Sequence, residues 1–220
     1  MSLHPLSLPS LQLSPGTRSL FHNLSWHEFE AILERRSDRP VPRLTYNKGT
    51  LELRMPTPEH EKIKILIGDF IKVLLEKDDR DYEPFGSSTF KKPDRVGLEP
   101  DDCFYIQNYA TMVGKLRVNL SVDPPPDLAV EVDVTSTTQL NVYRAIAVPE
   151  LWIFSNGKLK IFRFQLDNND YTEAIASSIF ETIPVKEIVP QFVDRGLTAG
   201  VSQAKRELRK WLRDRLNPNL

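Results

Sequence analysis

The chain has 220 residues, which is the length of one domain with short extensions. Hydrophobic residues make up 40% and charged residues 27%, so the composition predicts a folded core and excludes an intrinsically disordered chain. With 29 Lys and Arg against 30 Asp and Glu, the formal net charge is −1. This balance excludes a global basic excess for nucleic-acid binding but leaves room for a local basic patch.

One cysteine, Cys103, excludes an intrachain disulfide framework and a cysteine-rich zinc site. A chain without disulfides is typical of a reducing compartment, so we expect a cytoplasmic location. No apolar run reaches the roughly 18–20 residues of a membrane span, which predicts no membrane partner. The first ten residues lack a basic segment and contain prolines, so we expect no secretory signal.

Hydrophobic spacing, caps and turn residues predict most elements of the chain. They are, in chain order, an irregular arm over 1–24, a helix over 25–36, a hairpin over 43–54, a helix over 58–77, strands over 85–91, 98–106 and 127–134, a helix over 137–147, a hairpin over 150–164 and a helix over 201–216. The segment 107–122 is ambiguous between a surface insertion and an extended piece, and 165–195 is predicted as a strand and loops. The order predicts an α/β or α+β fold with a mixed central sheet flanked by helices. In domain terms, an arm over 1–24 precedes a domain over 25–200, and an amphipathic basic helix over 201–220 follows it.

The predicted strand over 127–134 has an unusual acidic face. Because side chains alternate along a strand, Leu128 and its apolar partners fall on one face, whereas Asp127, Glu131 and Asp133 fall on the other. Glu131 and Asp133 are then roughly 6–7 Å apart, from two rises of about 3.3 Å. Their mutual repulsion must be offset by solvent, by basic groups or by a cation.

Two interpretations of this acidic face remain open. One is an edge strand whose carboxylates are simply solvated. The other is a site for a hard cation, since the preceding strand opens with a second acidic cluster, Glu99, Asp101 and Asp102. Carboxylates from two neighbouring strands would suit Mg²⁺ or Mn²⁺ rather than Zn²⁺.

Four short motifs, in the right order, resemble those of a known family. They are residues 50–60 (TLELRMPTPEH), 97–101 (GLEPD), 125–131 (PPDLAVE), and 142–152, which begins with Val-Tyr and ends with Ala-Val-Pro-Glu-Leu-Trp. Over about residues 25–165 the chain resembles the Uma-two family of restriction-endonuclease-type proteins, in the PD-(D/E)XK nuclease superfamily. The resemblance implies a restriction-endonuclease-like fold.

The resemblance also implies a site for Mg²⁺- or Mn²⁺-dependent hydrolysis of DNA phosphodiester bonds. By this resemblance Asp101 and Glu131 are metal ligands, and the Val132 carbonyl is a third oxygen. His60 and Glu61, at the start of the long helix, assist. The ion would polarise the scissile phosphate and lower the pKa of the attacking water. For His60, a capping or packing role is an equal alternative.

The chain departs from the family pattern where a lysine is expected. The position two residues after Glu131 is Asp133, and the displaced position on the next helix is Gln139. Gln139 can orient water but carries no charge, and the nearest downstream basic residue, Arg144, cannot act as a base. A second hypothesis is therefore a catalytically degraded relative that acts as a binding or structural homodimer.

The predicted C-terminal helix is the one local basic patch of the sequence. Residues 201–220 contain six basic and two acidic residues, a net charge of +4. One interpretation is a helix that contacts DNA phosphates. The other, which we favour, is an amphipathic packing or dimer helix with a solvated basic face, because no aromatic platform accompanies it.

Overall fold

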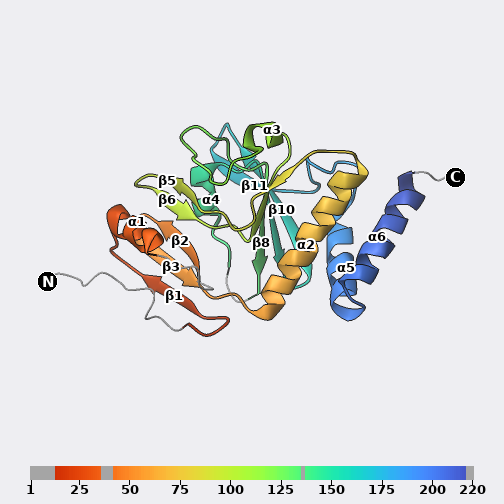
Figure 1. Cartoon of the computed structure of the whole chain (residues 1–220), viewed down its shortest axis with the longest axis horizontal. Coiled ribbons are helices and arrows are strands. Elements are labelled where there is room, and N and C mark those ends of the chain that lie inside the picture. Colours follow the sequence, from red (N-terminus) through yellow and green to blue (C-terminus); the bar gives the residue numbers. More distant parts are fainter. Residues whose placement is uncertain (1–12, 36–41, 135–136, 217–220) are drawn as a thin grey trace.

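The computed structural model describes residues 13–35, 42–134 and 137–216, which form two β-sheets with helices around them (Figure 1). One sheet is antiparallel and has the strand order β1-β3-β2-β6-β5. Its strands are β1 (Arg18–Phe21), β2 (Arg43–Asn47), β3 (Thr50–Arg54), β5 (Phe90–Lys92) and β6 (Val96–Leu98). We call it the hairpin sheet.

The other sheet, which we call the mixed sheet, has the order β11-β10-β9-β8-β7-β4. Strands β8 and β9 are parallel and the remaining pairs are antiparallel. Its strands are β4 (Glu83–Pro84), β7 (Asp102–Tyr105), β8 (Leu128–Asp133), β9 (Glu150–Ser155), β10 (Lys158–Gln165) and β11 (Asp170–Ala174). The helices are α1 (Trp26–Glu34), α2 (Pro58–Lys77), α3 (Tyr109–Met112), α4 (Leu140–Ile146), α5 (Val185–Thr198) and α6 (Val201–Leu216). The predicted mixed α/β fold class is thus confirmed, with the strands divided between two sheets.

The two long N-terminal helices begin where their caps predict. Ser25 caps α1 in a reciprocal capping box with Glu28. Thr57 caps α2, its side chain accepting a hydrogen bond from the His60 backbone N–H, and Pro58 occupies the first helical position. The cap at Thr57 therefore fixes the position of His60 in the first turn of α2.

The two predicted hairpins are also present, and both turns need residues with positive φ. Lys48 and Gly49 have φ of 45° and 87° between β2 and β3. Asn156 and Gly157 have φ of 50° and 69° between β9 and β10. Two consecutive positive φ values match the right-handed twist of the flanking strands. The turn at Gly49 thus aligns Arg43 with Arg54 across the hairpin.

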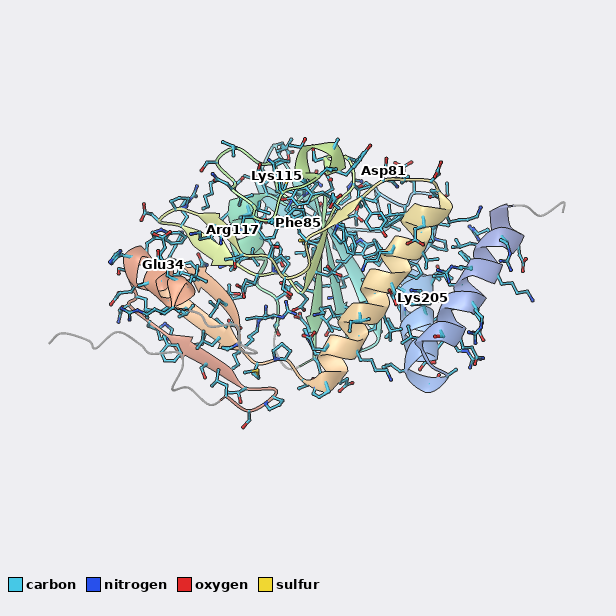
Figure 2. All side chains as sticks on the ribbon, in the orientation of Figure 1. Glu34, Asp81, Phe85, Lys115, Arg117 and Lys205 are labelled. Atoms are coloured by element: carbon cyan, nitrogen blue, oxygen red, sulfur yellow. The ribbon has the colours of Figure 1, made fainter. Side chains whose placement is uncertain are left out.

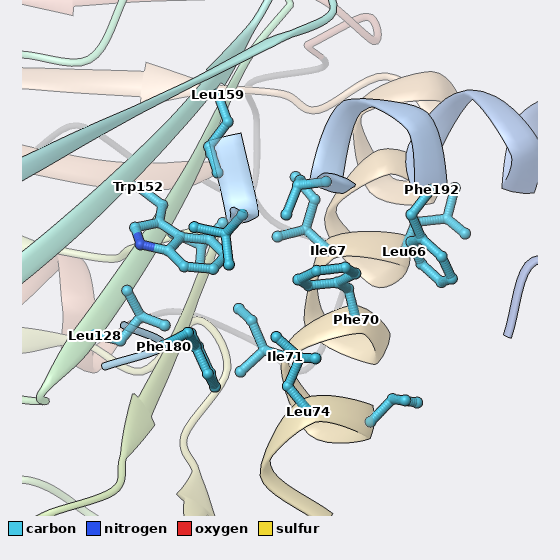
Figure 3. Close-up of a cluster of buried hydrophobic side chains, with 14 of the residues drawn as sticks. Leu66, Ile67, Phe70, Ile71, Leu74, Leu128, Trp152, Leu159, Phe180 and Phe192 are labelled. Atoms are coloured by element: carbon cyan, nitrogen blue, oxygen red, sulfur yellow. The ribbon is translucent and has the colours of Figure 1, made fainter. Parts of the chain in front are cut away.

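The largest core lies between α2 and the mixed sheet, as Figure 3 shows. Ile67, Phe70 and other apolar residues of α2 turn toward the sheet, where Trp152 and Leu128 are fully buried, whereas Leu66 lies beside Phe192 of α5. Helix α5 packs on both α2 and β10, and α6 packs on α5 and α2. A smaller core is formed by α1 and one face of the hairpin sheet. On the opposite face, β5 and β6 contribute apolar residues to a further core with α4 and the mixed sheet, whereas β2 and β3 carry polar residues there.

The chain passes from one sheet to the other at Glu99, Pro100 and Asp101. Leu98 ends β6 opposite Thr45 of the hairpin sheet, and Asp102 begins β7 opposite Val130 of the mixed sheet. The predicted continuous strand over 98–106 was therefore wrong. Pro100 has no backbone N–H, which suits the break between the two ladders.

Other local predictions need correction. Arg18–Phe21 is a strand paired with β3, so the predicted irregular arm was wrong there, and residues 1–12 lie outside the described residues. The predicted strand over 85–91 is replaced by β4 and β5, each of which is short and pairs with a different sheet. Strand formation at these positions depends on partners far along the chain, which local propensity does not reveal.

The helical predictions need two changes. Helix α4 begins at Leu140 rather than at Thr137. Helix α5 was missed within 165–195, because Pro190 lies inside it and argues against a helix. Its apolar residues nevertheless recur at helical spacing and pack on α2, so tertiary contacts outweigh the missing backbone bond. The ambiguous segment 107–122 contains the short helix α3 and turns.

Helix α6 confirms the predicted amphipathic C-terminal helix as far as residue 216; residues 217–220 lie outside the described residues. Ala204, Leu208 and Leu212 are buried on one face. Lys205 pairs with Asp69 of α2, its Nζ 3.2 Å from the carboxylate (Figure 2). None of the helices in the described part of the chain is long and apolar enough to cross a membrane.

Candidate active site between the two sheets

The acidic face of β8 points into the space between the two sheets. Leu128, Val130 and Val132 pack in the core beneath α2, as their alternation predicts. Glu131 points the other way and is only 1% exposed. The solvated edge strand is therefore excluded at Glu131: β8 is central, between β7 and β9, and the carboxylate is buried.

Asp101 and Glu131 converge, as the sequence predicts. Asp101 is also 1% exposed, and its Oδ2 accepts a hydrogen bond of 2.7 Å from the backbone N–H of Val132, the residue next to Glu131. The two carboxyl groups lie close enough to interact directly. Two buried acids at this separation require compensating charge.

The hairpin sheet supplies part of that charge through two arginines. Arg43 on β2 and Arg54 on β3 are directly opposite one another in the hairpin register. Two like charges in such a pair repel, so this arrangement is unfavourable unless anions face it. Those anions are Asp101, from the segment between the two sheets, and Glu131, from β8 of the mixed sheet.

Arg43 connects the two sheets on the Asp101 side. Its Nε lies 3.1 Å from Asp101 Oδ1, and its Nη1 donates a 2.8 Å hydrogen bond to the Pro100 carbonyl. Its Nη2 donates a 3.2 Å hydrogen bond to Glu61 Oε1. Arg43 therefore fixes the segment in which the chain changes sheets.

His60 approaches Asp101 from the first turn of α2. Its Nε2 lies 2.9 Å from Asp101 Oδ2, and its Nδ1 lies 3.5 Å from Glu61 Oε1. Burial lowers the His60 pKa, but the hydrogen bond to Asp101 and the nearby Glu61 carboxylate outweigh it and raise the pKa to about 9. Lys64 in turn approaches Glu61 at 2.5 Å. The contact between His60 and Asp101 favours a role for His60 in the site over a purely capping role.

Arg54 faces Glu131 on the other side of the pair. Its Nη2 lies 3.6 Å from Glu131 Oε2, and its Nε lies 3.7 Å from Glu52 Oε1. Burial lowers the Arg54 pKa, but the charges of Glu131, Asp101 and Glu52 raise it above its ordinary value. Arg18 holds the far side of Glu52 through a 2.9 Å hydrogen bond.

Glu131 is held from α4 as well. The buried Tyr143 hydroxyl donates a short hydrogen bond to Glu131 Oε1. Burial raises the pKa of Glu131, and the neighbouring Asp101 charge raises it further. For Asp101 burial acts in the same sense, but the bond to His60 and the charge of Arg43 lower its pKa below the ordinary value. The two acids therefore have divergent pKa values, which is common at functional sites.

A small cavity adjoins Glu131 between the two sheets. It has about 20 Å³ of space for the centre of a water molecule, enough for roughly one. Among its lining residues are Glu131, Arg54, Gln139 and Tyr143. An open groove of about 150 Å³ shares Thr45 and Gln139 with the cavity, among other residues, and leads outward along β2 and β3. Gln139 is thus brought to the site as predicted.

Asp133 has a different environment from Glu131. Its carboxylate accepts hydrogen bonds from the Thr138 backbone N–H at 2.9 Å and from the Thr138 hydroxyl at 2.7 Å. It therefore closes the turn between β8 and α4 and is absent from the residues that line the cavity. Val132 directs its N–H to Asp101, and the carbonyl of a strand residue projects to the same side as its N–H. That orientation is compatible with the predicted oxygen ligand.

Two other acidic residues have structural contacts. Asp102 lies on the opposite face of the chain from Asp101, where it packs against Gly68 of α2. Asp127 accepts backbone hydrogen bonds from residues 106–108 and so holds the loop after β7 at the start of β8.

The donor set fits a hard divalent cation. Asp101 Oδ1 and Glu131 Oε2 are buried oxygens without a hydrogen-bond partner in the described part of the structure. No group of three or more His, Cys, Asp or Glu side chains suited to a metal occurs among the described residues. Mg²⁺ does not require one, since it is commonly held by one or two carboxylates, waters and substrate phosphate.

The sequence interpretation missed Arg43, Arg54 and Tyr143 as members of this site. A signal for the arginines was available, because alternation puts Arg43, Thr45 and Asn47 on one face of β2 and the matching residues of β3 on the same face. Only the arrangement of the two sheets, however, shows that this polar face meets Glu131. The role of Tyr143 depends on the packing of α4, which its sequence does not reveal.

Comparison with known proteins identifies a family and a similar fold. The model of the Uma2 family, described as "Putative restriction endonuclease", matches residues 26–200. No curated protein matches the chain. Among solved structures, the chain is similar to a crystal structure of a putative nuclease belonging to DUF820 from Anabaena variabilis ATCC 29413. The two share 16% sequence identity, and the match covers 86% of this chain and 99% of that one with a TM-score of 0.50, a likeness that concerns the fold alone. Since the family match runs from α1 to the end of α5, the resemblance seen in the four motifs is confirmed, and the chain belongs to the Uma2 family of putative restriction endonucleases.

Proposed function

We propose that this protein hydrolyses DNA phosphodiester bonds at the site between its two sheets, with Mg²⁺ or Mn²⁺ held by Asp101, Glu131 and the Val132 carbonyl. The observation that carries the proposal is the convergence of two buried carboxylates, each with one oxygen that has no hydrogen-bond partner among the described residues. Two buried acids are costly unless opposite charge faces them, and a divalent cation would add to the charge that Arg43, Arg54 and His60 supply. Family membership supports the same nuclease-like role.

Each residue around the pair has a role in this proposal. Bound cation would polarise the scissile phosphate and lower the pKa of the attacking water. Asp101 is oriented by His60 and by the Val132 N–H, and Glu131 is oriented by Tyr143. Glu61 accepts a hydrogen bond from Arg43 and so holds that arginine beside Asp101. Gln139 lines the cavity and orients water there through its amide.

A second candidate is a catalytically degraded relative that binds a partner or forms a structural homodimer. The specific observation in its favour is the pairing of both carboxylates with arginines, which satisfies the acids electrostatically without a metal. Asp133 is engaged by Thr138 and Gln139 is neutral, so neither supplies the charge that a lysine would. The two candidates differ in whether a divalent cation binds the folded protein.

Thermal unfolding in the presence of metal separates the two candidates. Because a ligand that binds only the folded state stabilises it, millimolar Mg²⁺ or Mn²⁺ is expected to raise the Tm of the wild type. Asp101→Asn should abolish this shift, whereas Asp102→Asn, its neighbour on the opposite face, should retain it. An unchanged Tm of the wild type at millimolar metal would favour the degraded relative.

Nicking of supercoiled plasmid tests the chemistry. The wild type is expected to nick DNA with Mn²⁺, and Asp101→Asn and Glu131→Gln should each lower the rate by about 100-fold or more, since each removes a ligand group. Asp102→Asn is the matched control and should nick at the wild-type rate. Equal rates for all four proteins would indicate a contaminating nuclease and would refute the proposal.

Two further parts of the proposal concern surroundings and location. The basic face of α6 is a candidate DNA contact, but this helix packs on α2 and α5 at the end of the molecule opposite α1 (Figure 1), which favours a packing role. The fully buried thiol of Cys103 is compatible with the cytoplasmic location that we propose.

A further inference from the structure

Arg54 is the cation best placed to act on a phosphate at this site. It is the one basic residue among those lining the cavity beside Glu131, as far as the described residues go. Arg43 does not line this cavity and contacts the Pro100 carbonyl and Glu61 on the Asp101 side. The two arginines, although paired in the hairpin, therefore occupy different parts of the site.

The chemistry of the proposed reaction requires positive charge at the cavity. Attack on a phosphodiester increases negative charge on the non-bridging oxygens, and preorganised donors in a buried site stabilise it strongly. Gln139 carries no charge, and Asp133 is an anion used elsewhere. An arginine presents a planar fork of donors that matches phosphate geometry.

The surroundings of Arg54 hold its charge where the groove meets the cavity. Glu52 lines both the groove and the cavity, and an unshielded carboxylate there would repel a phosphate. Arg18 engages Glu52 through a 2.9 Å hydrogen bond, whereas the distance from Arg54 to Glu52 is 3.7 Å. The chain Arg18–Glu52–Arg54–Glu131 thus holds the Arg54 guanidinium between Glu52 and Glu131 at the cavity.

We infer that Arg54 is a phosphate-contacting residue, which binds the scissile phosphate and stabilises the charge that develops on it. The positive charge then comes from the hairpin sheet rather than from β8 or α4. The inference rests on the proposed function, since it identifies how that site recognises the phosphodiester class of substrate. Arg54 remains protonated and does not act as a base.

The test compares Arg54→Gln, Arg54→Lys and Arg195→Gln with the wild type. Arg195→Gln is the matched control, because it removes an exposed arginine of α5 that pairs with Glu207 and does not line the cavity. A double variant, Arg54→Gln with Glu52→Gln, removes one buried charge of each sign and guards against loss of the fold. Circular dichroism and Tm confirm that each variant is folded.

The first measurement is the affinity for a fluorescein-labelled 20-base-pair duplex in EDTA, followed by anisotropy, and it does not depend on metal or catalysis. Arg54→Gln and the double variant are expected to bind about 10-fold or more weakly, as for loss of a charged hydrogen bond. Arg54→Lys should fall between them and the wild type, and Arg195→Gln should match the wild type.

The second measurement is Mn²⁺-dependent plasmid nicking, in which Arg54→Gln should lose about 100-fold or more. A wild type that binds the duplex but does not nick would refute the proposed function alone, and the anisotropy series would then decide the role of Arg54. Wild-type affinity and nicking in the folded double variant, or no duplex binding by the wild type, would overturn the inference.

Discussion

At the scale of a single residue, His60 is held in its positively charged form within the site. Its raised pKa of about 9 means that the folded state holds a proton that the unfolded chain, with an ordinary value of 6.5, releases earlier. The resulting stabilisation is complete below about pH 6.5 and is lost as the pH rises through about 9. The buried imidazolium thereby balances part of the Asp101 and Glu131 charge.

We predict that the free energy of unfolding falls between pH 6.5 and pH 9, by at most about 3 kcal/mol from His60. The raised pKa of Glu131 also makes the free energy of unfolding fall as the pH rises. The urea titrations should therefore be done with the Glu131→Gln variant, so that only the contribution of His60 is followed. Adding His60→Gln to that background should flatten the remaining pH dependence. A slope unaffected by His60→Gln would mean that this histidine is not held in its charged form.

At the scale of elements, the close contact between α5 and α2 depends on Gly196. A Cβ at this position would lie 2.3 Å from Leu66 Cδ2 and 2.9 Å from Leu66 Cδ1. Leu66 is fully buried where α2 meets α5, so its side chain has little room to move. The glycine therefore allows α5, a helix that contains Pro190, to pack closely on α2.

We predict that Gly196→Ala lowers the free energy of unfolding by about 1–3 kcal/mol through overpacking. Leu66→Ala alone should cost about 2–5 kcal/mol by leaving a cavity. In the double variant the added methyl occupies part of that cavity, so the combined loss should be clearly smaller than the sum. Strictly additive losses in denaturant titrations would show that the two residues do not touch.

At the scale of the whole molecule, charged residues of this nearly neutral chain gather in two separate places, between the two sheets and on α6. Asp101, Glu131 and Arg43 are buried and Arg54 is half-buried between the sheets. On α6, Arg209, Lys210 and Arg213 are exposed. Helix α6 packs on α2 and α5, away from the hairpin sheet (Figure 1). Its basic face is therefore displaced from the cavity that we assign to the substrate.

We predict that the triple variant Arg209→Gln/Lys210→Gln/Arg213→Gln binds duplex DNA within about 2-fold of the wild type. If these residues bound phosphates, the slope of log affinity against log salt would become shallower by about 0.9 for each phosphate no longer neutralised. Anisotropy titrations at several salt concentrations measure both quantities. A shallower slope would restore α6 as a DNA-binding surface.

Much of the fold was predictable from local patterns. The caps at Ser25 and Thr57, the hairpin turns at Gly49 and Gly157 and the alternation of β8 all depend on residues close in sequence. The strands near Pro100 and helix α5 were not predictable, because their stability comes from partners distant in the chain. The same distinction applies to the site residues.

The amino-acid sequence by itself determined the acidic alternation of β8, the second acidic cluster and the family motifs, and these led to Asp101, Glu131 and Gln139. Only the tertiary structure decided that Arg43 and Arg54 neutralise those acids and that Asp133 closes a turn. The physical reason is that a strand's alternation specifies which face a side chain occupies, whereas the packing of two sheets specifies what that face meets.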